Sequence, residues 1–133
     1  MRSASLALAL LLMASAASAQ KKPLDAYHDA QILALSHCST ALQIARIDMD
    51  TAMMTRTAAP APSTVAFDCI SKAEADVKAR YTALAADMPE RDRNALVDIQ
   101  VAWVTAIRAT GGREFSALRA KFDEAWNRWE ATH

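Results

Sequence analysis

Apolar side chains recur every three or four residues along most of the chain, which is the spacing of one face of an α-helix. No segment shows the sustained apolar and polar alternation of a β-strand, and helix-favouring residues are abundant. The pattern predicts an all-α fold, a small bundle of about four helices in one domain.

Each predicted helix has one apolar face, and these faces together form the expected core. The first helix is expected to carry Leu24, Tyr27, Ala34, Leu35, Cys38, Ala41, Leu42, Ala45, Met49, Ala52 and Met53 inward. The other three contribute Val65, Cys69, Ile70, Ala73, Val77, Tyr81 and Leu84; Leu96, Ile99, Gln100, Trp103, Val104 and Ile107; and Phe115, Leu118, Phe122, Ala125, Trp126 and Trp129.

Prolines, glycines and capping residues mark the predicted ends of the helices. The first helix is expected from Pro23 or Leu24 to about Arg56, where the proline-rich stretch TAAPAPST interrupts it. Ser63 or Thr64 is expected to cap the second helix. Asp87, with Glu90 three residues later, is expected to cap the third helix in a capping box. The pair Gly111-Gly112 is expected to end it.

The first residues have the pattern of a secretory signal peptide. Arg2 precedes the apolar run Leu6 to Met13, and Ala17-Ser18-Ala19 forms an A-x-A cleavage site before Gln20. The apolar run is far shorter than the roughly 20 residues that span a bilayer. We therefore expect residues 1–19 to be removed, leaving a domain at 20–133 that is periplasmic or secreted and not inserted in a membrane.

The composition of the remaining 114 residues excludes some functions. Without Arg2 there are 14 Lys and Arg against 15 Asp and Glu, a net charge of −1, and no block of like charge occurs. Nucleic-acid binding normally needs a clustered basic surface, so we do not expect it. The near-zero charge also gives no strong long-range attraction to a charged partner.

The chain has two cysteines, Cys38 and Cys69, and His37 lies directly beside the first. These residues could form a metal site, a reactive thiol or a disulfide. The C-x-x-C-H motif of c-type haem attachment is absent. Neighbouring residues on a helix point about 100° apart, so His37 and Cys38 are poorly placed to hold one ion. A catalytic pair is disfavoured because Cys38 lies on an apolar face, where a thiol tends to be inert. In an oxidising compartment, a Cys38–Cys69 disulfide is the favoured interpretation.

That disulfide imposes a condition on the chain path. Cys38 is about 27 Å from the predicted end of its helix, whereas Cys69 is only about 7–8 Å into the next one. A tight hairpin would leave the two cysteines roughly 20 Å apart, and a bridge needs Cα atoms within about 7 Å. Seven extended residues cover about 22 Å. We therefore expect residues 57–63 to run back along the first helix.

Other candidate sites are sparse. Met49 and Met53 are one helical turn apart, and thioethers suit Cu(I). A copper carrier that uses these methionines, with His28 as a further candidate ligand, is therefore the alternative to a binding protein. The same methionines would equally fill gaps in a core. We find no catalytic constellation and expect neither an enzyme nor a bound cofactor. Trp129 is expected to be partly exposed and suited to a partner contact, and His133 to be mobile.

Residues 69–109 carry a recognisable series of spaced residues. Cys69 and Glu74 precede Tyr81-x-x-Leu84, and Leu96, Gln100, Trp103 and Arg108 follow after a short break. This segment resembles the periplasmic LprI-type lysozyme-inhibitor family. In the family an arginine usually follows the tryptophan by four residues and a cysteine comes next, whereas here Arg108 follows by five and no cysteine is present.

The resemblance implies a small helical secreted module whose partner is a protein of the cell envelope, with lysozyme as one such partner. From the residues themselves, Trp103 is expected to pack on a helix face and Gln100 to hydrogen-bond across the helix pair. The function that we expect is therefore protein binding in the periplasm or outside the cell.

Overall fold

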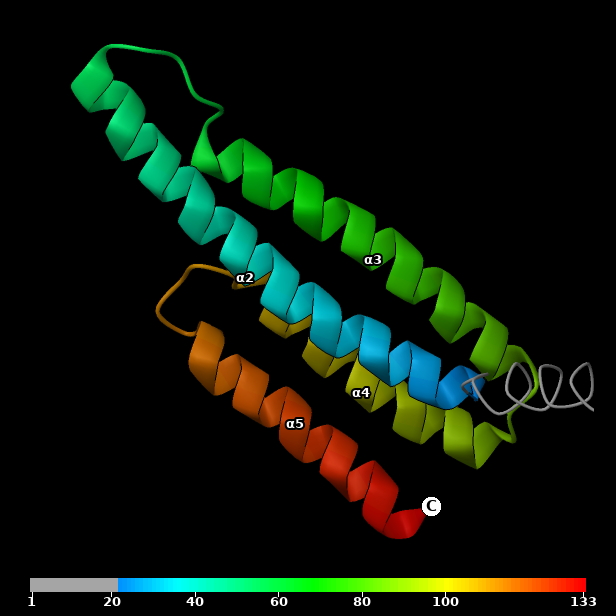
Figure 1. Ribbon diagram of the computed structural model, residues 1–133. Helices are drawn as coiled ribbons and strands as arrows, with labels where there is room; N and C mark the ends of the chain where they lie inside the picture. The colour runs from blue at the N-terminus through cyan, green and yellow to red at the C-terminus, as the bar shows by residue number, and fades with distance from the viewer. Residues whose placement is uncertain (1–21) are drawn as a thin grey trace, which may run out of the picture.

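The computed structural model describes residues 22–133, and within this range it confirms the all-α fold. The helices there are α2 (Pro23–Thr55), α3 (Pro62–Ala86), α4 (Glu90–Arg108) and α5 (Phe115–Thr132), with no strand between them (Figure 1). The expected signal peptide and its cleavage site lie outside the described residues.

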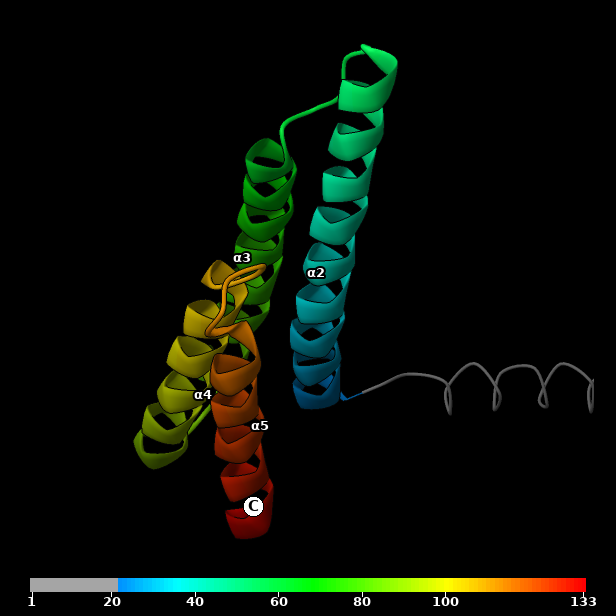
Figure 2. The same cartoon turned by 90° about the vertical axis from the view of Figure 1, so that its left-hand side faces the viewer.

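The helices form two antiparallel hairpins that pack together. α2 pairs with α3 and α4 pairs with α5, while α4 also packs against both α2 and α3. α2 is the longest helix, and its C-terminal part projects beyond the rest of the bundle (Figure 1). Figure 2 shows α2 at one edge, with the three other helices on the same side of it.

A continuous apolar core joins the four helices. Its largest wholly buried side chain is Trp103 of α4, whose indole Nε1 donates a hydrogen bond to the backbone oxygen of Gln31 at 3.0 Å. No helix among residues 22–133 combines the length and apolarity needed to cross a bilayer. The buried apolar residues are Tyr27, Leu35, Cys38, Leu42, Ala45, Ala52, Val77, Leu96, Ile99, Trp103, Ala106, Ile107, Phe122, Ala125, Trp126 and Trp129.

The predicted disulfide is confirmed, and the predicted chain path accompanies it. α2 ends where Arg56 adopts a left-handed conformation with φ of 55°, and the N–H of Thr57 bonds the carbonyl of Ala52 at 2.9 Å. Residues 57–61 then run back along the end of α2 before α3 begins (Figure 1). This return places Cys69 beside Cys38, with 5.6 Å between their Cα atoms.

The predicted caps are wrong. α3 begins at Pro62 after Ala61, so neither Ser63 nor Thr64 caps it. Asp87 follows the end of α3, and α4 starts three residues after it, behind Pro89. None of the four helices has a side-chain hydrogen bond at its N-cap. Proline at or next to the first turn explains three of these starts, because its fixed φ begins a helix without a capping side chain.

The Gly111-Gly112 pair also acts differently from the prediction. α4 ends at Arg108, and Gly111 adopts its positive φ of 81° inside the following turn. A Cβ on Gly111 would lie 2.1 Å from Cδ2 of Leu42, so the turn packs directly on α2. Nη2 of Arg46 donates to the Gly111 carbonyl at 3.2 Å. The glycine therefore permits a close contact between the two hairpins.

Most of the predicted inward residues are buried or partly buried, but Met53 is an exception. Its side chain is 72% exposed. α3 starts too late along the molecule to cover this part of α2, so the prediction that Met53 faces the core is wrong.

Candidate docking groove

The disulfide lies at one wall of an apolar groove between α2 and α3. Cys38 is wholly buried and Cys69 partly so, and both are bonded to each other, so neither sulfur is a free thiol. His37 is exposed beside the bridge and lines the groove. Cys38 is thus part of a structural disulfide, and His37 is its exposed neighbour.

Small side chains make the groove. It has a volume of about 840 Å³, and every residue that lines it belongs to α2 or α3. Alanine recurs along α2 at about one-turn intervals, which keeps the helix surface low at these points. Such a hollow is large enough for side chains of a partner, since ligand sites commonly measure about 300–1,000 Å³. The alanines lining it are Ala26, Ala30, Ala34, Ala41 and Ala73.

Charged residues of both signs border the groove. Asp29, Lys72, Asp76 and Arg80 all line it, and Nε of Arg80 lies 3.2 Å from Oδ2 of Asp76. Two acidic and two basic groups leave the border with no net charge. The groove is therefore apolar inside and electrostatically balanced at its edge.

A second hollow continues the groove toward the start of α2. It measures about 730 Å³ and shares Ala26 and Arg80 with the first. Together the two hollows follow α2 from Lys22 to Ala41, which is about 28 Å of helix at 1.5 Å per residue. That length corresponds to about five helical turns.

The residues that resemble the lysozyme-inhibitor motif hold the helices together. The Tyr27 hydroxyl of α2 donates a hydrogen bond to Oε1 of Gln100 on α4. Gln100 thus bonds across helices as expected, although its partner is on the first helix. Burial, together with the nearby Tyr81, raises the pKa of Tyr27, so this hydroxyl keeps its proton. The contact fixes α4 against α2.

The remaining motif residues are also structural. The ring of Tyr81 lies 6.4 Å from that of Tyr27, and Arg108 forms an ion pair with Glu74, from Nε to Oε1 at 2.7 Å. Leu84 is partly buried against the core, and Leu96 is wholly buried within it. The motif therefore explains the framework behind the groove, and apart from Cys69 its residues do not line the groove's first hollow.

Gln31 is a buried polar residue that sequence patterning missed. Its side chain is wholly buried on α2, and neither its Nε2 nor its Oε1 makes a hydrogen bond of ordinary geometry among the described residues. An unpaired buried amide destabilises a folded protein by about 1–3 kcal/mol. Its position one turn after Tyr27 was the available signal, since both residues share one helical face.

His28 packs on an aromatic surface. Its ring stacks on Trp126 of α5 with 3.9 Å between ring centroids and an interplanar angle of 4°. Burial lowers the pKa of His28, although the carboxylates of Glu130, Asp29 and Asp123 oppose the shift. The stack joins the first helix to the last.

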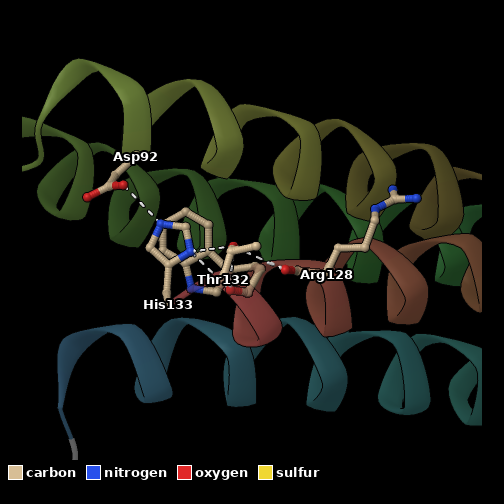
Figure 3. Close-up of polar contacts among 5 residues, drawn as sticks. Asp92, Arg128, Thr132 and His133 are labelled. Atoms are coloured by element: carbon tan, nitrogen blue, oxygen red, sulfur yellow. Dashed lines mark hydrogen bonds and ion pairs between the residues drawn. The ribbon is translucent and has the colours of Figure 1, made fainter.

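His133 links the end of α5 to α4, contrary to the expectation that it is mobile. Its ring stacks on Trp129 at a centroid distance of 3.7 Å, and Nε2 lies 2.9 Å from Oδ1 of Asp92 on α4 (Figure 3). Its Nδ1 contacts the Trp129 carbonyl oxygen at 3.0 Å. The hydrogen bond to Asp92 raises the pKa of His133. Trp129 itself is only 6% exposed, so the prediction that it is partly exposed is wrong.

The candidate copper ligands are far apart. His28 and Met49 lie on one continuous helix 21 residues apart, which is about 31 Å, so they cannot bind the same ion. Met49 is half-buried and Met53 is exposed, one turn apart. Within residues 22–133 no group of three or more His, Cys, Asp or Glu side chains is arranged to hold a metal.

Comparison with other proteins does not assign the chain to a family. No protein-family model matches the chain, and neither a search of curated proteins nor one of solved structures finds a match. The function must therefore be argued from the residues and surfaces described above.

Proposed function

We propose that this chain is a periplasmic or secreted protein-binding module whose α2–α3 groove receives an amphipathic helix of a protein partner. The observation that carries the proposal is the groove itself, which is apolar inside, floored by alanines and bordered by charges of both signs. Helix-in-groove recognition uses such surfaces, with the apolar face of the bound helix turned into the groove. The disulfide and the signal-peptide pattern support a location outside the cytoplasm.

The dimensions of the groove favour a helix over a small molecule. The two hollows extend about 28 Å along α2, which matches about five turns of a bound helix. Alanines at 26, 30 and 34 let another backbone approach closely. Lys72 and Asp76 on the α3 side can pair with opposite charges that flank the apolar face of the partner.

Lysozyme is the first partner to test, because residues 69–109 resemble a lysozyme-inhibitor family. The balanced border of the groove gives no electrostatic preference for a cationic enzyme. An assay of cell-wall lysis by lysozyme, with and without equimolar purified protein, decides this case. Inhibition that is lost on blocking the groove identifies lysozyme as the partner, whereas unchanged lysis excludes lysozyme inhibition.

Site-specific photo-cross-linking tests the groove independently of the partner's identity. A photoreactive benzoylphenylalanine replaces Lys72 at the groove or, as a control, the exposed Val101 on α4. The proposal predicts a discrete adduct with a second protein at Lys72 and none at Val101 in intact cells. Equal labelling at both positions, or none at either, would overturn it.

A blocking substitution makes the same experiment specific. Ala34→Arg places a long charged side chain in the groove, while Ala120→Arg adds the same charge at an exposed position of α5. The adduct at Lys72 should disappear with Ala34→Arg and persist with Ala120→Arg. Circular dichroism and thermal unfolding verify that both variants are folded.

A further inference from the structure

α2 has a second apolar face directed away from the core, which borders the α2–α3 groove at Leu33 and His37 and is otherwise uncovered. Among the eight large apolar side chains that are exposed in residues 22–133, five belong to α2. Four of these lie on one stripe: Leu33 is 70% exposed, Ile44 53%, Ile47 64% and Met54 80%. We call this set, with the residues between them on the same face, the outer stripe.

The outer stripe follows a heptad repeat. Leu33, His37, Thr40, Ile44, Ile47, Thr51 and Met54 are separated by alternating steps of four and three residues. Such a repeat forms the seam of a two-helix coiled coil. The outer stripe therefore has the spacing of a helix-pairing surface, although three of its positions are polar.

The stripe points away from the core. Ile44 follows the buried Leu42 by two residues, so the two side chains point about 160° apart around the helix. Figure 2 shows α3, α4 and α5 on one side of α2, which leaves the opposite side open along the length of the helix. A second helix can lie there without displacing any part of the bundle.

The area of the stripe is sufficient for a weak but specific dimer. The part that can pair, from His37 to Met54, extends about 26 Å, and a helix with its side chains is about 10 Å wide. Pairing two such faces removes on the order of 1,000 Å² of accessible surface from water, near the lower limit for specific interfaces. Monomeric proteins rarely leave an apolar stripe of this length exposed to water.

The stripe is complementary to itself when two copies run antiparallel. With the midpoint between Ile44 and Ile47, Ile44 of one copy faces Ile47 of the other, and Thr40 faces Thr51. His37 faces Met54 in the outermost layers. Antiparallel pairing thus places like with like in every layer near the centre, as expected for a twofold interface.

Charge is compatible with the same register. Asp48 and Asp50 flank the stripe near its centre, and in this pairing their neighbours on the second copy are Ala41 and Gln43. No two carboxylates are brought together. We propose that two copies of the chain associate through the outer stripe of α2 as an antiparallel homodimer.

Two matched double variants test the proposal. Ile44→Glu with Ile47→Glu puts four carboxylates into the centre of the proposed interface, whereas Val97→Glu with Val101→Glu makes equivalent changes at exposed positions of α4. All four positions are exposed in the single chain, so both variants should keep the wild-type helical spectrum.

Sedimentation velocity from about 1 to 100 µM protein measures the outcome. We expect wild type and the α4 variant to be dimers in the upper part of this range, and the α2 variant to dissociate at least about 100-fold more readily. A wild-type protein that is monomeric throughout, or an α4 variant that dissociates as readily as the α2 variant, would overturn the proposal.

A spin label at Ser36 tests the orientation. This residue is exposed beside the stripe, and in the antiparallel register two copies of it are offset by about 28 Å along the helices. With helix axes about 10 Å apart, the expected label separation is about 30 Å. Parallel helices in register would instead place the two labels about 10 Å apart, which would contradict the antiparallel arrangement.

Discussion

The contact between Gly111 and α2 gives a quantitative test of how the two hairpins are joined. Gly111→Ala changes one residue in two unfavourable ways. It forces a non-glycine residue to φ of 81°, which destabilises by about 1–2 kcal/mol. It also places a Cβ 2.1 Å from Cδ2 of the buried Leu42, and overpacking of this kind typically destabilises by about 1–3 kcal/mol. We expect the free energy of unfolding to fall by about 3 kcal/mol.

The adjacent glycine is a matched control. Gly112 does not have a positive φ, and a Cβ there would meet only the Ala109 carbonyl oxygen, at 3.1 Å. Replacing glycine by alanine also removes freedom from the unfolded chain, which stabilises by about 0.4–1 kcal/mol. We therefore expect Gly112→Ala to change the free energy of unfolding by less than about 1 kcal/mol.

Urea unfolding followed by tryptophan fluorescence measures both variants, because all three tryptophans are buried in the core. Leu42→Ala separates the two effects of Gly111→Ala. In the Leu42→Ala background the clash with Cδ2 is gone, and the flexible end of Arg46, 2.9 Å from the added Cβ, can move aside, so Gly111→Ala should destabilise mainly by the backbone contribution of about 1–2 kcal/mol. Equal losses for the two glycine variants would refute the proposed contact.

Four further predictions follow from the interior and the pH-sensitive contacts. Reduction of the disulfide, which closes a loop of 31 residues, should lower the free energy of unfolding by about 3–4 kcal/mol in urea titrations with and without reductant. Gln31→Leu should raise it by about 1–3 kcal/mol, because an unpaired amide is replaced by an apolar side chain; a loss would show that the amide has a partner. The pKa of His28 is lowered in the folded protein, so stability should fall as the pH drops below about 6.5, where the unfolded chain takes up the proton; His28→Phe should weaken this dependence. The pKa of His133 is raised, so its contribution is complete below about 6.5 and is lost as the pH rises through the folded-state value; Asp92→Asn should reduce this loss, as measured by unfolding midpoints across the pH range.

Helix faces and the disulfide were predictable from sequence because they depend on repeated local rules. The three- and four-residue spacing identifies the core sides of all four helices, and helix rise alone required a strap that returns Cys69 to Cys38. Helix ends were predicted less well. Capping residues compete with proline starts, and residues 61–62 and 89–90 show that the proline determined where α3 and α4 begin.

Exposure depends on the relative lengths of packed helices, which periodicity does not provide. Met53 continues the inward stripe of α2 but is exposed because α3 starts lower in the bundle. Trp129 is near the end of the chain yet is buried, because His133 stacks on it and bonds Asp92. Both differences come from contacts between elements distant in sequence.

The spacing of alanines along α2 is the sequence signal of the candidate groove. Alanines at 26, 30 and 34 recur at one-turn intervals and mark a low surface on α2. Whether such a surface is filled by a neighbour depends on how closely α3 approaches. The spacing of the helices, and therefore the groove, could be recognised only in the folded structure.

The yield of the photo-adduct at Lys72 tests the central claim most directly. If the α2–α3 groove receives a partner helix, Ala34→Arg should reduce this yield by an order of magnitude or more, on the scale expected when a charge is buried without a partner. Ala120→Arg should leave the yield unchanged. An adduct of equal yield in all three proteins would show that the partner binds elsewhere and would contradict the proposed function.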